Sequence, residues 1–320
     1  MTMASEKLMA THSKFTWDPA KRPNTFVIGA PKCGTTALCS YLEQHPNVFM
    51  SQPKESHHFV AEEMPGKARK FASKENYARI FDEVGAQHNV VAEGSVWYMY
   101  SQTAVENISK FDPSAKIILM FRRPDEMVYS MHQQAVVNFS EDIIDFDRAW
   151  ETALAGNKRR SWSKLCDERS KLDYHRIALF SEQLERVFTF FPKDQVHIIF
   201  YDDFKSSTQG CFQEVLKFLA IDDFEVDIKK VNESKVVVNK YIGKFLTKPP
   251  NILMKLNRIV KKVFGLEKLG FRKRLISLNT RVQKREPLNT KTRADIINYY
   301  REDITKLGLL CQRDLSHWLK

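Results

Sequence analysis

The chain has 320 residues, of which 43% are hydrophobic, and it carries a formal net charge of +11 at pH 7. This hydrophobic fraction supplies a core for one large domain and is typical of a globular protein. The positive charge indicates an anionic partner, and by itself it does not choose among nucleotide, nucleic acid, glycan and membrane.

The N-terminal residues 1–22 are polar and mixed in charge, and we predict that they form a flexible segment. They lack the apolar region of a signal peptide, and no later apolar run approaches the length of a membrane span. We therefore expect a cytoplasmic protein. The five cysteines form no CxxC pair, so we expect them to be reduced.

Short apolar runs rich in β-branched residues predict buried parallel strands at residues 25–29, 48–50, 90–94, 116–121 and 196–201. Helical patterns lie between them at 35–44, 103–110, 125–138 and 176–191. This alternation predicts an α/β fold, a P-loop-type doubly wound parallel sheet flanked by helices.

The sequence becomes basic and partly amphipathic over residues 231–288, and a helical pattern follows at 292–310. We interpret the basic segment as a helical C-terminal appendage, a cap or lid within a single domain that spans residues 23–320. Contact with a membrane surface is the alternative for this segment.

The stretch "FVIGAPKCGTTALCSYL", residues 26–42, reads as a strand, a turn and the start of a helix. Gly34 lets the backbone approach a ligand, Thr35 and Thr36 add hydroxyl groups, and Lys32 adds a positive charge. A Walker loop has its lysine directly after the second glycine, whereas Lys32 comes two residues before Gly34. We predict a phosphate site; the alternative is an ordinary strand-to-helix turn.

The strand at 116–121 ends in Arg122, Arg123 and Pro124. A kinase needs a carboxylate for Mg²⁺ at such a position, and arginines bind phosphate directly. The pattern therefore predicts an anion site without a metal. Ser130, two helical turns after Arg122, could present its hydroxyl to the same phosphate; alternatively it is a surface serine.

The stretch "SQPKESHHFV" places Lys54, Glu55 and His57 together in a loop. A lysine can neutralise charge on a leaving oxygen, while a glutamate or histidine removes a proton from an incoming group. A solvated surface loop is the alternative. His57 and His58 lack a third ligand, which argues against a metal site.

Taken in order, the motifs "GAPKCGTTAL", "HPNVFMSQPKESHHF", "RRPDEMVYS", "YYREDITKL" and "RDLSHWL" resemble the PAPS-dependent sulfotransferases, in particular the heparan-sulfate-type and bacterial branch. PAPS is 3′-phosphoadenosine 5′-phosphosulfate, and PAP is its product. The resemblance runs from about Thr25 to Leu319.

The resemblance implies specific roles. The 5′-phosphosulfate would be held by Lys32, Cys33, Gly34, Thr35 and Thr36, and the 3′-phosphate by Arg122 and Ser130. Lys54, Glu55 and His57 would match the KExHF element of the family, whose glutamate is usually assigned as the base; His57 is the alternative. Lys32 would stabilise the departing oxygen. A loop before the last helix closes over the cofactor in relatives, which implies Arg272 and Lys273 here.

One motif departs from the family. Many relatives carry Glu-Lys-Ser/Thr-Pro where this chain has "AEGSVWYMY", so that the second lysine is replaced by Gly94. Its role would fall to Lys54, to Lys32 or to a substrate group, or is not needed. Four nearby residues could line an acceptor pocket, with core packing as the alternative for the aromatic ones: Glu93, Ser95, Trp97 and Tyr98.

The sequence thus predicts transfer of the sulfuryl group from PAPS to a hydroxyl or amine of a small-molecule, sugar or lipid acceptor, in line and without metal, with release of PAP. We expect no nucleic-acid partner. A Mg²⁺-dependent kinase and a basic nucleic-acid- or heparin-binding protein are the alternatives.

Overall fold

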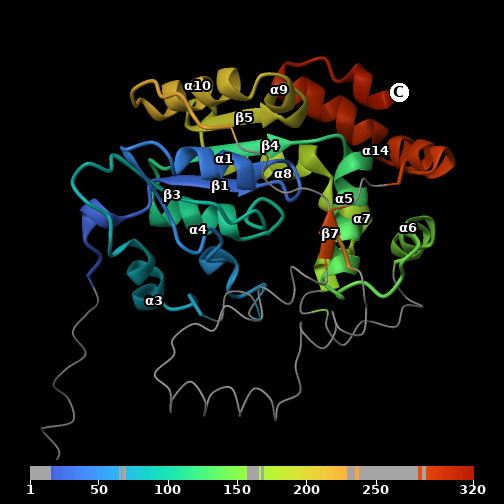
Figure 1. Ribbon diagram of the computed structural model, residues 1–320, viewed down its shortest axis with the longest axis horizontal. Coiled ribbons are helices and arrows are strands. Elements are labelled where there is room, and N and C mark those ends of the chain that lie inside the picture. Colours follow the sequence, from blue (N-terminus) through green and yellow to red (C-terminus); the bar gives the residue numbers. More distant parts are fainter. Residues whose placement is uncertain are drawn as a thin grey trace, which may run out of the picture.

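The computed structural model describes residues 16–64, 66, 70–156, 166, 169–228, 235–237, 280–282 and 286–320. Its centre is a five-stranded parallel sheet in the order β2-β3-β1-β4-β5 (Figure 1). The strands are β1 (Thr25–Gly29), β2 (Val48–Met50), β3 (Val90–Glu93), β4 (Lys116–Phe121) and β5 (Val196–Phe200). Each predicted strand is therefore confirmed, as is the α/β fold class.

Helices cover both faces of the sheet. The α-helices are α1 (Thr35–Leu42), α3 (Lys74–Ala78), α4 (Ala104–Phe111), α5 (Pro124–Val137), α6 (Phe146–Leu154), α7 (Tyr174–Ile177), α8 (Phe180–Phe190), α9 (Tyr201–Ser206), α10 (Thr208–Leu219) and α14 (Thr290–Cys311). The 3₁₀ turns are Pro19–Lys21, His58–Val60, Arg79–Phe81, Arg169–Leu172, Lys193–Gln195 and Ser316–Leu319. None of the described helices is both long enough and apolar enough to cross a bilayer.

The strand order decides which helices share a face. The chain moves from β1 to β2 in one direction along the sheet, and from β3 to β4 in the other. Because parallel crossovers are right-handed, α1 and α4 lie on opposite faces. Tyr41 of α1 contacts Phe212 of α10 with ring centroids 6.4 Å apart, so α10 lies on the α1 side.

The sheet forms the core because its strands are apolar on both faces. All five residues of β1 and all four of β3 are buried, as expected for parallel strands covered by helices. The C-terminal segment joins this core through Tyr300 and Trp318, which are fully buried. The last helix therefore belongs to the same packed unit as the sheet.

Two features lie outside the sequence-based expectations. Trp17 packs its ring against Tyr77 and Phe111, so the packed chain includes residues that were assigned to the flexible segment 1–22. A second sheet pairs β6 (Lys235–Val237) with β7 (Thr280–Val282) in antiparallel register. It brings both ends of the predicted basic cap together, while most of residues 231–288 lie outside the described part.

The topology also defines where a ligand would bind. The chain changes direction at β1, so the carboxyl ends of β1, β3 and β4 surround a switch point, which is where open α/β sheets bind ligands. The predicted phosphate loop follows β1, the arginine pair follows β4, and the segment Ser51–His57 follows β2. These motifs therefore meet at one edge of the sheet.

Candidate active site

The turn between β1 and α1 has the backbone geometry of an anion-binding loop. Gly34 has a φ of 101° and Lys32 a φ of 64°, both in the left-handed region, before α1 begins at Thr35. A Cβ atom at Gly34 would lie 3.2 Å from Met120 Cε and from Tyr201 Cδ2, so glycine is needed for space as well as for conformation. The first N–H groups of the helix have no intrahelical acceptor, and the helix dipole favours an anion there.

The side chains of this loop differ in exposure. Thr35 is buried and Thr36 is exposed. Lys32 Nζ donates to Gln134 Oε1 of α5 at 3.3 Å, which holds the ammonium on the α5 side of the loop. The loop therefore offers backbone N–H groups, one exposed hydroxyl and one tethered cation.

The Cys33 thiol points into the core and away from the exposed surface of the loop. The side chain is fully buried, and Sγ donates to the Pro31 carbonyl at 3.4 Å. Burial raises the pKa of the Cys33 thiol to about 12, although the charges of Arg122 and Lys32 oppose this shift. The thiol therefore stays protonated at neutral pH.

Arg122 and Ser130, the predicted 3′-phosphate residues, both belong to the segment that runs from β4 into α5. Arg122 Nη1 donates to the Lys32 carbonyl at 3.4 Å, and the guanidinium lies 4.4 Å from the centroid of the Tyr201 ring. Ser130 is 1% exposed, and its Oγ has no hydrogen-bond partner within the described residues. An unsatisfied buried hydroxyl is costly, so Ser130 fits a site that a ligand oxygen completes.

Lys54, Glu55 and His57 form one charged group. Glu55 Oε1 lies 3.3 Å from Lys54 Nζ, and Glu55 Oε2 lies 3.3 Å from His57 Nε2. Glu55 is 30% exposed on its side chain, whereas His57 is 7% exposed and has a φ of 57°. The carboxylate is therefore held between two basic groups while one side remains open to solvent.

Gly94 stands where many relatives carry the second lysine, and its surroundings leave no room for a side chain. A Cβ atom at this position would lie 2.8 Å from Cys39 Sγ and 3.0 Å from Lys54 Cγ. The aliphatic part of Lys54 thus occupies the space that a side chain at residue 94 would need. This contact favours Lys54, among the alternatives left open, as the source of the missing positive charge.

The four predicted acceptor residues lie in the core. Glu93, Ser95 and Tyr98 are fully buried, and Trp97 is 4% exposed. Glu93 accepts hydrogen bonds from surrounding hydroxyl groups, and Trp97 contacts the Tyr100 ring. Their acceptor role stays a prediction, and their burial favours the alternative of packing.

The sequence did not indicate three partners of the predicted residues. Glu126 pairs with Arg122, Tyr201 stacks on it, and Gln134 holds Lys32. The spacing of four residues between Arg122, just before α5, and Glu126 in its first turn was an available signal. Tyr201 directly follows β5, so its position at the carboxyl end of a neighbouring strand was another.

Three further observations bear on the site. Arg272 and Lys273 lie outside the described residues, and their predicted role stays a prediction.

The two adjacent histidines contact different partners. The His58 ring stacks on the Tyr77 ring, with ring centroids 4.1 Å apart, whereas the His57 ring faces Glu55. Among the described residues, no three His, Cys, Asp or Glu side chains are grouped as a metal site would need.

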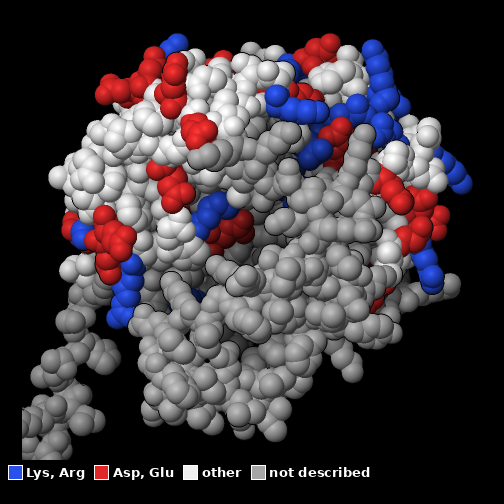
Figure 2. Space-filling view, viewed as in Figure 1, with Lys and Arg blue, Asp and Glu red and all other residues white. Residues whose placement is uncertain are grey.

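The charges on one face are unevenly distributed. Figure 2 shows mainly Asp and Glu side chains on the α10 side, whereas on the α14 side Lys and Arg side chains are interspersed with Asp and Glu. Basic and acidic groups also meet at a hollow near the middle of this face.

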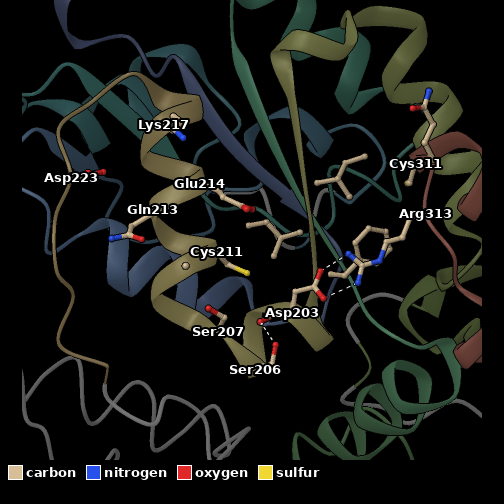
Figure 3. A pocket seen from close by; sticks show the side chains of 15 residues that line it. Asp203, Ser206, Ser207, Cys211, Gln213, Glu214, Lys217, Asp223, Cys311 and Arg313 are labelled. Carbon is tan, nitrogen blue, oxygen red and sulfur yellow. Dashed lines mark hydrogen bonds and ion pairs between the residues drawn. The ribbon is translucent and has the colours of Figure 1, made fainter.

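A cavity with a volume of about 970 Å³ lies elsewhere, between β5, α10 and the end of α14 (Figure 3). Asp203 and Arg313 form an ion pair at its wall, where Arg313 Nη2 lies 2.7 Å from Asp203 Oδ1. No residue of the phosphate loop or of the Lys54–His57 segment lines it. We therefore place the candidate site by the convergence of the motifs and not by this cavity.

Comparison with known families decides the identity of this arrangement. The family described as the Sulfotransferase domain matches residues 22–236, which is more than half of the chain. The chain belongs to the sulfotransferase domain family. The resemblance predicted from the motifs is confirmed.

Two curated relatives of this sulfotransferase-family chain are similar over slightly less than two thirds of its length. The human bifunctional heparan sulfate N-deacetylase/N-sulfotransferase 3 is 27% identical over 207 residues, which cover 62% of this chain and 22% of the relative. The human heparan sulfate glucosamine 3-O-sulfotransferase 5 is 25% identical over 197 residues, which cover 62% of this chain and 53% of the relative. The chain thus spans about a fifth and about half of the length of these two relatives.

Two longer matches include the C-terminal part. The membrane-associated sulfotransferase kil1 of Dictyostelium discoideum is 21% identical over 366 residues, which cover 92% of this chain and 66% of the relative. The crystal structure of a sulfotransferase from Alicyclobacillus acidocaldarius superimposes with a TM-score of 0.68 at 20% identity, covering 93% of this chain and 99% of that chain. The latter likeness shows a shared fold.

Proposed function

We propose that the protein transfers a sulfuryl group from PAPS to a hydroxyl or amine of an acceptor and releases PAP. The observation that supports the proposal is that Arg122 donates to the Lys32 carbonyl of the turn before α1, while the buried Ser130 hydroxyl on α5 lacks a partner among the described residues. Two phosphate positions on one sheet edge match the two phosphate groups of PAPS. Membership of the sulfotransferase domain family supports the same reaction.

The residues present fit such a cofactor. The N–H groups at the start of α1, Lys32 and the Thr36 hydroxyl would hold the 5′ end, and Arg122 and Ser130 would hold the 3′-phosphate. When bound, PAPS supplies an activated sulfuryl group whose bridging S–O bond breaks as the bond from sulfur to the acceptor forms. Arg272 and Lys273 are included in the proposal as residues that close over the cofactor.

Glu55 would act as the general base. Its carboxylate is held between Lys54 and His57 at 3.3 Å from each, so the open side of the carboxylate can take the proton of an acceptor. Lys54 and Lys32 would offset the negative charge that grows on the leaving oxygen. His57 is the alternative base. We propose that the step is in line and needs no metal, since these positive side chains supply the charge.

The acceptor is proposed only as a class. Relatives named as N-sulfotransferase and as 3-O-sulfotransferase point to amine and hydroxyl acceptors alike. We therefore propose a sugar, lipid or small molecule, and the choice between nitrogen and oxygen is left to the experiment. The cytoplasmic location and the contact of residues 231–288 with a membrane surface stay predictions.

Calorimetric titration with PAP tests the proposal directly. The purified protein is titrated with PAP in EDTA, with ATP and Mg²⁺ as the parallel sample. Binding of PAP without metal would support the proposal and justify a screen of hydroxyl and amine acceptors with PAPS. Binding of ATP that depends on Mg²⁺, without binding of PAP, would overturn it in favour of a kinase.

A further inference from the structure

A buried carboxylate lies directly behind the Lys54–His57 segment. Glu93, at the end of β3, is fully buried and accepts four hydrogen bonds from hydroxyl groups. Its Oε1 accepts from Ser56 Oγ at 2.7 Å, from Ser95 Oγ at 2.5 Å and from Tyr98 OH at 2.8 Å, and its Oε2 accepts from Tyr77 OH at 2.5 Å. We call these five residues the Glu93 cluster.

The four hydroxyl groups of the Glu93 cluster all donate their hydrogen atoms to the Glu93 carboxylate. Burial, followed by the nearby charge of Glu93, raises the pKa values of Tyr77 and Tyr98 well above their usual range, so both hydroxyls remain donors. A carboxylate accepts and does not donate, so Ser56 and Ser95 also direct their hydrogens toward Glu93. The lone pairs of both serine oxygens are then available to accept other hydrogen bonds.

Those lone pairs accept from the backbone of the segment that carries the proposed base. The His57 N–H donates to Ser95 Oγ at 3.1 Å, and the His58 N–H donates to Ser56 Oγ at 3.1 Å. His57 has a φ of 57°, which is an unfavourable backbone conformation for a residue other than glycine. The two serine hydroxyls thus accept from the backbone N–H groups of His57, the residue with the positive φ, and of His58, the residue that follows it.

The position of His57 decides the position of Glu55, because His57 Nε2 lies 3.3 Å from Glu55 Oε2. We propose that Glu93 is a positioning residue: through Ser95 and Ser56 it fixes the backbone at His57 and His58 and thereby orients the Glu55 carboxylate. This inference rests on the proposed function. It assigns Glu93 and Ser95 a role behind the site instead of a contact with the acceptor.

Ser95→Ala tests the inference, with Ser181→Ala as the matched control. Ser181 is likewise buried, and its Oγ donates to a carboxylate oxygen of Asp303 at 2.6 Å, at the junction of α8 and α14. Both variants lose one buried serine hydroxyl, but only Ser95 accepts from His57 N–H. Ser56→Ala, which releases His58 N–H, is the second variant if Ser95→Ala does not fold.

Two readouts separate positioning from general stability. Amide hydrogen exchange should become at least fivefold faster at His57 in Ser95→Ala and stay unchanged there in Ser181→Ala. With PAPS and the acceptor found in the screen, Ser95→Ala should lower kcat by roughly 10- to 100-fold, as expected for a misplaced catalytic group, while KM for the acceptor and PAP affinity stay within about threefold.

The outcomes are distinct. Exchange at His57 that is equal in Ser95→Ala and the parent protein, or equal losses of kcat in both serine variants, would overturn the positioning role. A rise in the acceptor KM at constant kcat would also overturn it, because that result means direct contact with the acceptor. If the parent protein binds no PAP, the proposed function fails, and the exchange measurement still decides whether Ser95 holds His57.

Discussion

The guanidinium of Arg122 donates two hydrogen bonds to one carboxylate oxygen of Glu126, at 2.8 Å from Nε and 2.6 Å from Nη2. Arg122 is also the residue that we propose for the 3′-phosphate of the cofactor. Glu126 therefore occupies donors that a phosphate group would use. Binding of PAP has to replace this carboxylate or to use the remaining Nη1 edge, which among the described residues donates to the Lys32 carbonyl at 3.4 Å.

We predict that Glu126→Gln strengthens PAP binding by up to about fivefold. The Glu126 side chain is 37% exposed, so its ion pair with Arg122 contributes less than about 1 kcal/mol and the gain is limited accordingly. Calorimetry with PAP measures the change, and Glu106→Gln is a control because it breaks an exposed i,i+4 pair with Lys110 on α4. Weaker binding by Glu126→Gln would mean that Glu126 orients Arg122 and does not compete for it.

Ser130→Ala should separate binding from stability. Since Ser130 Oγ lacks a partner within the described residues, its loss should leave the free energy of unfolding unchanged or raise it by up to about 1 kcal/mol. The same variant should weaken PAP binding by roughly 5- to 20-fold, because one hydrogen bond to a charged phosphate oxygen is lost. Thermal unfolding and calorimetry give the two numbers. Lower stability with unchanged PAP affinity would remove Ser130 from the site.

Burial should protect Cys33 from alkylation. A thiol with a pKa of about 12 is ionised to only about one part in 10⁴ at pH 8, and the thiolate is the reactive form. We predict that iodoacetamide at pH 8 leaves Cys33 unmodified in the folded protein and modifies it after denaturation, as read by peptide mass mapping. PAP affinity should be the same before and after the treatment. Rapid modification of Cys33 in the folded protein would show that the loop opens.

The phosphate loop could be predicted because its geometry is local. Gly34 and the start of α1 are adjacent in sequence, and the strands before and after them carry unbroken apolar runs. The same holds for Lys54, Glu55 and His57, which lie within four residues, with Glu55 in an ion pair with Lys54 and in contact with the His57 ring. Where neighbours in sequence make the site, the sequence indicates its chemistry.

The direction of the Glu93 side chain could not be predicted in the same way. Glu93 lies where relatives carry the Glu-Lys-Ser/Thr-Pro element, and the predicted acceptor contact rests on this resemblance. Its side chain turns into the core because the donors come from distant segments, Tyr77 and Ser56, whose approach depends on the tertiary packing. Trp17 gives a second case, since its contact with Phe111 depends on the position of α4.

Glu55→Gln should abolish turnover while PAP affinity remains within about twofold. The amide is nearly isosteric but cannot take a proton, and loss of a general base lowers rates by about 10²- to 10⁴-fold. Turnover is measured with PAPS and the acceptor found in the screen, and PAP affinity by calorimetry. His57→Gln is the companion variant. Near-normal turnover in Glu55→Gln together with inactive His57→Gln would assign the base to His57.

Gly94→Ala should lower kcat by about tenfold through Lys54. The new Cβ would lie 3.0 Å from Lys54 Cγ and 2.8 Å from Cys39 Sγ, so the lysine stem has to move and its ammonium is displaced with it. PAP affinity should change less than about threefold, because the role that we propose for Lys54 concerns charge that develops during transfer. Gly85→Ala is the control, since its Cβ meets only the flexible end of the exposed Gln87 side chain.

A double variant identifies which of the two contacts matters at residue 94. Cys39→Ala removes the sulfur atom that the new Cβ would meet and leaves the approach to Lys54 in place. If displacement of Lys54 causes the loss, Gly94→Ala combined with Cys39→Ala stays about tenfold slow in kcat. Recovery of the parent kcat in the double variant would instead assign the loss to strain against α1, and Lys54 would no longer explain how this chain works without a second lysine.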